Sequence, residues 1–247
     1  MNFKDHFSTQ STDYAKYRPR YPKELYDFLF SHTKEKKIAW DVATGNGQVA
    51  VELANQFEKV IATDASENQI NHAKQHPKVI YKVSAAENSG LPDGIVNLIT
   101  VGQALHWFDF DKFFVEVKRA AKSGCFFAAW GYKLHHITSD IDKVTKRFYE
   151  EVVGPYWPRE RTFVDNGYNN IPIPIKPVET PPFKLHWRWN MNELLGYLST
   201  WSSTQLYIKD KGHNPLELIE ADLQQAWGNP LEDLEVVWPI FIRAGYL

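Results

Sequence analysis

Short apolar runs alternate with segments of helical spacing over the first half of the chain. Five of these runs have the length of a buried strand, at residues 38–43, 59–64, 79–83, 95–101 and 125–130. Between them, apolar side chains recur every three or four positions, as in residues 49–57 and 110–121. Strands that alternate with helices in this way are typical of a doubly wound, mostly parallel sheet, so the pattern predicts an α/β fold of the Rossmann-like type.

The pattern changes after the fifth of these strands. Residues 140–153 have helical spacing, and prolines then crowd into residues 155–182. Residues 184–189 alternate like a strand, and two further helical patterns follow at residues 191–200 and 215–227. The second half therefore predicts a helical and loop-rich insertion that contains one strand.

Both ends of the chain carry proline-containing patterns. Residues 17–22 hold two prolines, and Pro22 suits the first turn of a helix because its missing N–H has no partner there. Residues 234–243 predict a final strand. That strand contains Pro239, which predicts a sheet edge or a bulge, since proline cannot donate to the strand ladder.

Composition and charge narrow the class of protein. Of the 247 residues, 43% are hydrophobic and 23% are charged, which is enough apolar material for a sizeable core. The 28 basic and 30 acidic side chains nearly balance and form no basic stripe, so we expect no nucleic-acid partner. We also expect no membrane span, no signal peptide and a cytoplasmic location, because no long apolar run occurs. The single Cys125 lies in an apolar run typical of a buried thiol.

The sharpest chemical signal is a glycine turn between the first strand and the helical pattern that follows it. Gly45 and Gly47 let the backbone turn tightly and let a ligand lie against it, while the amides of the helix point at that ligand. Asp64 ends the second strand, where a carboxylate can bind both hydroxyls of a ribose. These features predict an adenosine-containing cofactor at the carboxyl ends of the first two strands.

Asp41 favours one such cofactor. The spacing of Gly45, Gly47 and Ala50 also satisfies the loose dinucleotide fingerprint, so an NAD(P)-dependent oxidoreductase is an alternative. Asp41 lies inside the strand, four residues before Gly45, where its carboxylate would repel a pyrophosphate but suit an ammonium group. S-adenosylmethionine carries an ammonium group and no phosphate. A protein that binds this cofactor without catalysing a reaction is a further alternative.

The pattern of Asp41, Gly45, Gly47, Asp64 and the run 86–92 resembles the class I S-adenosylmethionine-dependent methyltransferases. More narrowly, the chain is similar to a small-molecule subgroup that includes the trans-aconitate methyltransferases of fungi. Four segments carry this narrower resemblance: residues 14–22, 103–108, 200–203 and 238–243. The resemblance implies a sheet of about seven strands whose last strand is antiparallel.

The resemblance also implies a set of cofactor-binding residues: Tyr14, Asp41, Ala43, Gly45, Gly47, Asp64, Ala65, Ala86, Glu87 and Gln103. In this interpretation Asp41 lies near the amino end of the methionine moiety, and Asp64 binds the ribose. Ala86 and Glu87 border the adenine, and Gln103 lies beside the sulfonium. Transfer of the methyl group converts the cofactor into S-adenosylhomocysteine.

Organisation follows from the same resemblance. We expect a single methyltransferase domain in four parts: a lid and first helix at 1–34, a cofactor-binding core at 35–133, a substrate cover at 134–233 with a core strand near 183–190, and a final core strand at 234–247. Residues 14–21 would fold over the cofactor. The family commonly has glycine where this chain has Ala43, and we expect the turn to form nevertheless, with a small effect on affinity.

Methyl transfer is an in-line displacement, so the protein needs mainly to align the nucleophile. No metal is required, and the nine histidines show no helix-borne metal pair. A carboxylate acceptor is ionised near neutral pH, whereas a hydroxyl or an amine would need a base. His106 is the candidate for that base, and packing in the cluster 106–108 is its alternative role.

The acceptor is expected to be a small molecule, most simply an organic acid. A carboxylate favours arginine, whose planar fork holds it at two points. The candidate substrate-binding residues are Trp107, Trp157, Arg159, Arg161, Trp201 and Arg243. Six of the nine tryptophans lie at or after Trp157, in the segments that would cover the substrate with a water-excluding wall. We expect a monomer or a homodimer.

Overall fold

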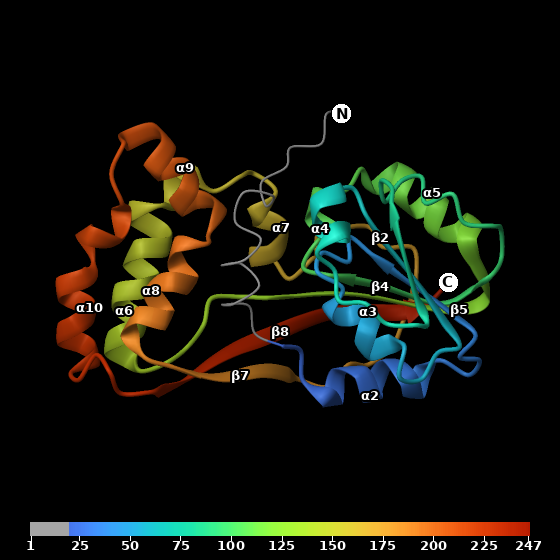
Figure 1. Ribbon diagram of the computed structural model, residues 1–247, viewed down its shortest axis with the longest axis horizontal. Coiled ribbons are helices and arrows are strands. Elements are labelled where there is room, and N and C mark those ends of the chain that lie inside the picture. The colour runs from blue at the N-terminus through green and yellow to red at the C-terminus, as the bar shows by residue number, and fades with distance from the viewer. Residues whose placement is uncertain (1–19) are drawn as a thin grey trace.

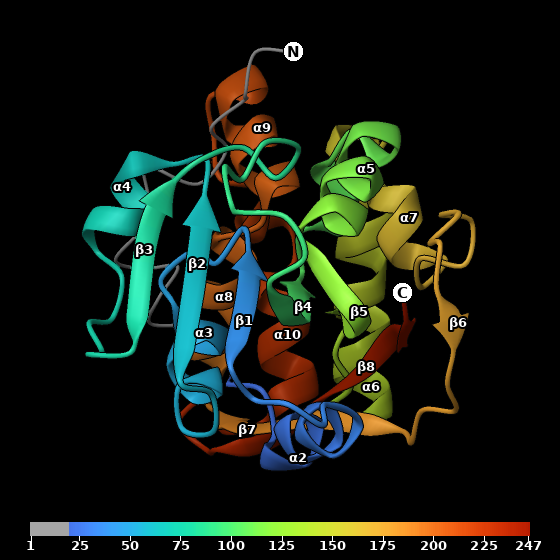
Figure 2. The same ribbon diagram turned by 90° about the vertical axis from the view of Figure 1, so that its right-hand side faces the viewer.

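The computed structural model describes residues 20–247 and has a mixed eight-stranded sheet (Figure 1, Figure 2). Its strands are β1 (Ile38–Val42), β2 (Lys59–Asp64), β3 (Val79–Val83), β4 (Val96–Gly102), β5 (Ala121–Tyr132), β6 (Lys176–Pro177), β7 (Phe183–Trp189) and β8 (Leu234–Tyr246). Their order is β3-β2-β1-β4-β5-β8-β6, with β7 paired to β8. Strands β1 to β5 are parallel, whereas β8 is antiparallel to its neighbours. The predicted Rossmann-like fold is confirmed.

Burial explains why the sequence predicts the central strands so directly. Almost every residue of β1, β2 and β4 is buried, as in parallel strands that are covered on both faces. Alternate side chains enter two separate cores, so that Ala39 belongs to one and Trp40 to the other. Cys125 in β5 is 1% exposed, which confirms the predicted buried thiol, and burial raises the pKa of that thiol to about 12.

Helices cover both faces of this parallel part. The first-half helices are α2 (Lys23–His32), α3 (Gln48–Leu53), α4 (Glu67–Asn71), the short η2 (Leu105–Trp107) and α5 (Phe110–Ala120). Leu25 of α2 and Leu53 of α3 share the core that contains Ala39. Phe113 of α5 packs on the opposite face, where its ring centroid lies 6.4 Å from that of Trp40.

The second half builds a helical end beside the sheet. Its helices are α6 (Ser139–Arg147), the π-helical η3 (Phe148–Val152), η4 (Gly154–Tyr156), α7 (Arg161–Asp165), α8 (Met191–Ser199), α9 (Ser202–Lys211), η5 (Pro215–Leu218) and α10 (Glu220–Trp227). Figure 1 shows α6, α8, α9 and α10 gathered at one end, with α7 between them and the parallel strands. Every helix within residues 20–247 is too short or too polar to cross a lipid bilayer.

Helix α9 is missing from the sequence prediction. Its residues, Ser202–Lys211, are mostly polar, and the two that are buried are Ser203 and Thr204. No apolar stripe therefore marks its buried face, because small hydroxyl side chains make the contact. Only Thr200 and Trp201 separate it from α8, so the sequence shows no loop between them either.

The expectation that Pro239 marks a sheet edge or a bulge is wrong, because β8 pairs with β7 in continuous register through Pro239. Strand β8 lies inside the sheet, with β5 on one side and β7 on the other. The carbonyl of Pro239 accepts from the Lys133 amide at 3.3 Å, just beyond the last β5–β8 pair, Tyr132 with Ile240. Since the N–H and C=O of a strand residue point to the same side, the missing N–H of Pro239 falls where that ladder ends.

Candidate active site

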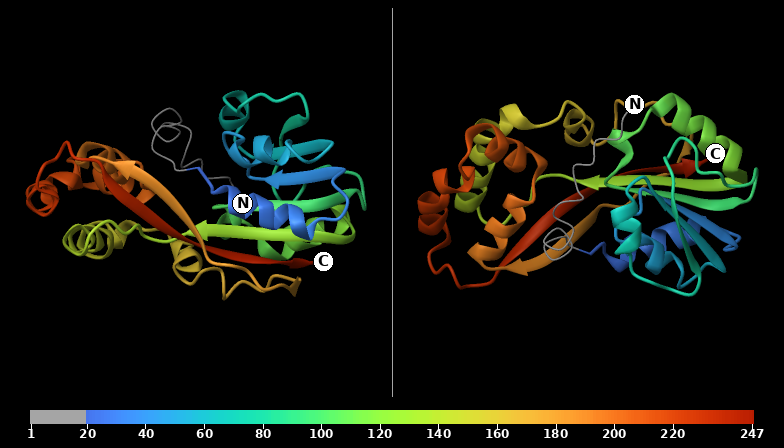
Figure 3. Two further views of the ribbon diagram at one scale, coloured as in Figure 1. Left: turned by 90° about the horizontal axis from the view of Figure 1, so that it is seen from below. Right: turned by 45° about the horizontal axis from the view of Figure 1, so that its top comes forward.

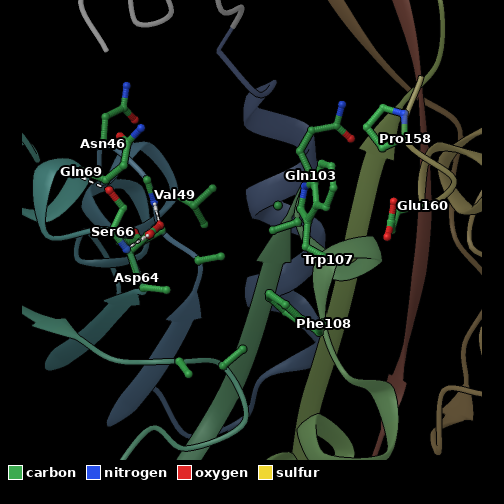
Figure 4. A pocket seen from close by; sticks show the side chains of 18 of the residues that line it. Asn46, Val49, Asp64, Ser66, Gln69, Gln103, Trp107, Phe108, Pro158 and Glu160 are labelled. Carbon is green, nitrogen blue, oxygen red and sulfur yellow. Dashed lines mark hydrogen bonds between the residues drawn. The ribbon is translucent and has the colours of Figure 1, made fainter. Parts of the chain in front are cut away.

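A cleft of about 1900 Å³ opens where β1, β2 and β4 end. Figure 4 shows its two walls, with Asp64, Ser66 and Gln69 on one side and Pro158 and Glu160 on the other. The first wall follows the carboxyl ends of the parallel strands, where ligands bind in folds of this type. The second wall comes from the helical end, namely residues 155–160 and helix α9.

Most of the predicted cofactor-binding residues line this cleft. They are Asp41, Ala43, Gly45, Asp64, Ala65, Ala86, Glu87 and Gln103. Gly47 adjoins them at the start of α3. Tyr14 lies outside residues 20–247, as does most of the predicted lid, although Tyr21 at its end does line the cleft.

The glycine turn has a left-handed backbone at three positions. The φ angles are +52° at Ala43, +55° at Gly45 and +78° at Gly47. Gly47 also meets a close neighbour, because a Cβ atom built there would lie 2.1 Å from the hydroxyl oxygen of Tyr81. The predicted turn therefore forms with Ala43 in a conformation that glycine adopts more readily.

Asp41 is a buried acid beneath this turn, with 1% of its surface exposed. The Thr44 hydroxyl donates to one carboxylate oxygen at 2.5 Å, and the Thr100 hydroxyl donates to the other at 2.7 Å. Burial raises the pKa of Asp41 to about 6, although the two hydroxyls counteract part of that rise. The site thus holds a desolvated carboxylate that a cation would stabilise.

Asp64 connects the glycine turn to α4. One carboxylate oxygen accepts from the Gly45 amide at 2.8 Å, and the other accepts from the Ser66 amide at 2.9 Å. Ser66 in turn caps α4, because its hydroxyl accepts from the Gln69 amide (Figure 4). The carboxylate of Asp64 therefore lies in the wall of the cleft and is held there by two backbone amides.

Glu87 fixes the far side of the same cleft. Its carboxylate accepts from the Asp109 amide at 2.9 Å, immediately before α5. Asp109 caps that helix through the Lys112 amide. Ala86, beside Glu87, is 8% exposed and presents only a methyl group. The sequence reasoning missed that Glu87 also anchors a helix, since the two segments are distant in the chain.

Gln103 lies at the point where the cleft meets a second, smaller cavity. Its backbone is left-handed, with φ at +60°, and its backbone N–H donates to the Trp130 carbonyl at 2.8 Å. Its side-chain oxygen accepts from the Tyr132 amide at 3.2 Å. Figure 4 shows Gln103 between the two walls of the cleft, beside Trp107.

The second cavity has a volume of about 70 Å³. It shares five lining residues with the cleft, namely Gln103, Trp107, Tyr132, Trp157 and Pro158. Its remaining lining includes His106, Arg161, Tyr197 and Trp201. Five predicted catalytic or substrate-binding residues therefore meet in one place: His106, Trp107, Trp157, Arg161 and Trp201.

Arg161 is held rigidly at this cavity. Its guanidinium lies 4.6 Å from the Trp157 ring centroid and 5.3 Å from that of Tyr149. Its Nε donates to the Tyr149 hydroxyl at 2.8 Å and to Asp165 at 3.3 Å. The two terminal nitrogens have no hydrogen-bond partner among residues 20–247, so they are the donors that a ligand can use.

The other two predicted arginines lie elsewhere. Arg159 lines the large cleft. Arg243 lines neither the cleft nor the small cavity, because its guanidinium donates to the Tyr168 carbonyl at 3.0 Å and to the Asn169 side chain at 3.4 Å. The sequence places all three near the substrate, but the fold brings only Arg161 to the cavity beside Gln103.

His106 is almost fully buried, at 8% exposure. Its Nδ1 lies 3.0 Å from the Tyr168 hydroxyl oxygen. Burial, together with the smaller effect of the positive charge of Arg161, lowers the pKa of His106 to about 3. An imidazole with so low a pKa is neutral at pH 7 and accepts protons poorly, which counts against its predicted role as a base.

Comparisons with known proteins agree with this geometry. The family described as "Methyltransferase domain" matches residues 40–129. A Dictyostelium discoideum protein named as a candidate methyltransferase is 35% identical over 97% of this chain and 94% of its own length. A solved structure from Anaeromyxobacter dehalogenans, described as a candidate type II methyltransferase, is 41% identical, with a TM-score of 0.87 over 93% of this chain and 97% of that one.

Proposed function

This chain belongs to the class I S-adenosylmethionine-dependent methyltransferases, and we propose that it methylates the carboxylate of a small organic acid. Membership of this family rules out the alternative that the chain is a nicotinamide-dependent oxidoreductase. A protein that binds the cofactor without methylating anything stays as an outcome of the assay below. The narrower resemblance to trans-aconitate methyltransferases stays a prediction.

The residues at the carboxyl ends of β1, β2 and β4 fit the cofactor. The buried carboxylate of Asp41 suits the ammonium group of the methionine moiety. The carboxylate of Asp64 lines the cleft at the end of β2, where an acidic side chain can bind the ribose hydroxyls. Ala86 and Glu87 would border the adenine, and Gln103 would lie beside the sulfonium. When bound, S-adenosylmethionine supplies an electrophilic methyl group on that sulfonium.

The position of Arg161 is the main reason for proposing a carboxylate as the methyl acceptor. Its guanidinium is stacked on Trp157 at the cavity that adjoins the cleft, and its terminal nitrogens remain available. Arginine held in this way is suited to a carboxylate. A carboxylate is already ionised, so the reaction requires no base, which agrees with a neutral His106. Trp107 and Trp201 complete the apolar walls that keep water away from the reacting atoms.

A methylation assay tests this proposal. The purified protein would be incubated with methyl-deuterated S-adenosylmethionine and a panel of carboxylic acids, and ester products would be detected by mass spectrometry. We expect an ester that releases methanol in mild alkali. Tight cofactor binding with no methylated acid in the panel contradicts the proposal, whereas a methylated hydroxyl or amine would correct its acceptor.

Variants of the three arginines sharpen the test. We expect Arg161→Ala to raise the KM for the acid by about tenfold or more, since a hydrogen bond to a charged group is lost. Arg159→Ala should have a smaller effect, and Arg243→Ala should act mainly on stability. Arg188→Ala on β7, whose guanidinium donates to the exposed Asp233 carbonyl, is the matched control. If Arg159→Ala, Arg161→Ala and Arg243→Ala all keep full activity, the hypothesis that an arginine binds the acceptor is wrong.

The organisation of the chain stays a proposal too. We propose a single domain whose residues 134–233 cover the substrate, acting in the cytoplasm as a monomer or homodimer without a nucleic-acid partner. Residues 155–160 and helix α9 support the covering role, because they form the second wall of the cleft. Light scattering on the purified protein would establish the oligomeric state.

A further inference from the structure

A strained turn brings Tyr168 against His106. After α7 the backbone is left-handed at Gly167 and again at Tyr168, with φ at +61° and +60°. A bulky residue keeps such a conformation only where its surroundings hold it there. The Tyr168 carbonyl accepts from Arg243, and its ring packs edge-on against Phe241 with centroids 4.9 Å apart. These contacts fix the phenol, which is completely buried.

The hydrogen bonds of that phenol determine the tautomer of His106. The Tyr168 oxygen lies 3.0 Å from Nδ1 of His106. Burial raises the pKa of Tyr168, and the backbone amides of His106 and Leu105, which act on this oxygen as donors, oppose part of that rise. Nδ1 is therefore the one acceptor available to the phenol O–H among residues 20–247. If His106 donated instead, that buried O–H would have no partner, which is costly. Hence Nδ1 accepts, and Nε2 carries the proton.

The other ring nitrogen has no such partner within the protein. Among residues 20–247, Nε2 of His106 has no hydrogen-bond partner, and the side chain lines the small cavity. Within the described part of the chain, the other titratable groups at that cavity are Tyr132, Lys133, Arg161 and Tyr197, and none of the lining residues there is a carboxylate. The cavity therefore offers two well-held donors, Nε2–H and the Arg161 guanidinium, for one anionic oxygen group.

We propose that His106 donates a hydrogen bond from Nε2 to the anionic oxygen of the acceptor, and that Tyr168 is the positioning residue that fixes this tautomer. His106 touches the substrate as a donor and takes no proton from it. The identity of the anion as a carboxylate rests on the function proposed above, whereas the tautomer rests on the contacts between His106 and Tyr168. Tyr168 thus extends the site to a residue that lines neither the cleft nor the cavity.

Nitrogen NMR tests the tautomer without any substrate. The protein would be labelled with ¹⁵N-histidine, and the signals of His106 would be identified by their loss in His106→Gln. We expect Nε2 to show the chemical shift of a protonated ring nitrogen and Nδ1 that of an unprotonated one. The reverse assignment would overturn the proposal.

Two substitutions at His106 separate a donor from a base. The amide nitrogen of glutamine can take the place of Nε2, whereas that of asparagine takes the place of Nδ1. We expect His106→Gln to keep most of the activity towards the acid that the wild type methylates fastest, and His106→Asn to lose about tenfold or more in kcat/KM. If His106 were a general base, both His106→Gln and His106→Asn should show equal, large losses of kcat/KM. His186→Gln on the exposed face of β7 is the control.

A double-mutant cycle tests Tyr168 as a positioning residue. Tyr168→Phe should raise the KM for the acid severalfold and leave cofactor affinity unchanged, because His106 then adopts either tautomer. In the His106→Gln background, Tyr168→Phe should cost nothing further, since an amide has no tautomer to fix. Equal losses in both backgrounds would reduce Tyr168 to a structural role and overturn the proposal. If no acid is methylated, the proposed function fails, while the NMR result still decides the tautomer.

Discussion

At the scale of single residues, burial sets the charge of the two most informative side chains. It raises the pKa of Asp41 and lowers that of His106, so each is pushed towards its neutral form. Asp41 is thereby prepared for a cationic group, and His106 is kept as a neutral donor. Sequence reasoning identified both residues, but it could not assign their protonation states, because those depend on desolvation by residues distant in the chain.

A pH-dependent stability change should identify Asp41. The folded protein holds this proton up to about pH 6, whereas the unfolded chain releases it near the ordinary value of 3.8. Between these values the folded state binds more protons, so the free energy of unfolding falls as pH rises. We expect Asp41→Asn to stabilise the cofactor-free protein at pH 8 by roughly 3 kcal/mol, with little effect at pH 3.5, and to weaken S-adenosylmethionine binding.

Urea unfolding at both pH values and calorimetric titration with the cofactor check this prediction. Asp27→Asn on α2, whose carboxylate pairs with Lys23 at the surface, is the control and should change neither measurement. A loss of stability at pH 8 in Asp41→Asn would show that the carboxylate is favourably solvated in the folded protein.

Ala43 stores strain that glycine would release. Its φ of +52° costs an L-residue about 1–2 kcal/mol, offset in part by the greater freedom of glycine in the unfolded chain. We therefore expect Ala43→Gly to raise the free energy of unfolding by about 0.5–1 kcal/mol in urea melts. Ala50→Gly inside α3 is the matched control and should lower it by about 1 kcal/mol. If Ala43→Gly and Ala50→Gly lower the free energy of unfolding equally, the backbone at Ala43 is not strained.

At the scale of elements, the parallel strands place the cofactor side of the cleft and irregular segments place the substrate side. The observed bounds of β2 and β3 equal those predicted, because each strand is a local apolar run. Helix α9 was missed, although its residues line the cleft. Its buried face consists of hydroxyl side chains, so hydrophobic periodicity cannot show it.

Gly131 in β5 has no side chain, and the side chain of Gln103, which lines both the cleft and the small cavity, occupies the space beside it. A Cβ atom there would lie 2.3 Å from the Gln103 side-chain oxygen and 2.5 Å from Cζ of Phe241. We expect Gly131→Ala to displace Gln103, to lower methyl transfer by more than tenfold and to destabilise the fold by about 1–3 kcal/mol. Methylation kinetics and thermal melts measure the two effects.

Gly154→Ala is the control for this substitution. Its added Cβ would lie 3.5 Å from the nearest atom, the Tyr149 carbonyl oxygen, which is ordinary contact. Both measurements should stay close to wild type for that variant. Undiminished methyl transfer in Gly131→Ala would show that the position of Gln103 does not matter for the reaction.

At the scale of the whole molecule, one long strand connects the two ends. Figure 3 shows β8 extending from the helical end to the C-terminus beside β5. Its residues 234–240 pair with β7, and its residues 240–246 pair with β5. The cleft lies between the parallel strands and the helical end, so a ligand that fills it contacts both parts.

Ligand binding should therefore stabilise the molecule as a unit. S-adenosylhomocysteine at about 100 times its Kd should add about 2.7 kcal/mol to the free energy of unfolding, which corresponds to a rise of about 5–10 °C in Tm for a chain of this size. NAD at the same concentration should leave the Tm unchanged. Two separate thermal transitions, of which only one responds to S-adenosylhomocysteine, would show that the two parts unfold independently.

The Rossmann-like fold, the glycine turn and the edge of the sheet where the cofactor-binding residues gather can all be predicted from the amino-acid sequence. Those features are local, since apolar periodicity and turn-forming residues act within a few positions of the chain. Three other features are visible only in the folded molecule: Arg161, Trp157 and Trp201 meet at His106, Arg243 lies elsewhere, and Pro239 lies inside the sheet. Packing between distant segments controls those contacts, and burial then controls the charge of each side chain at the site.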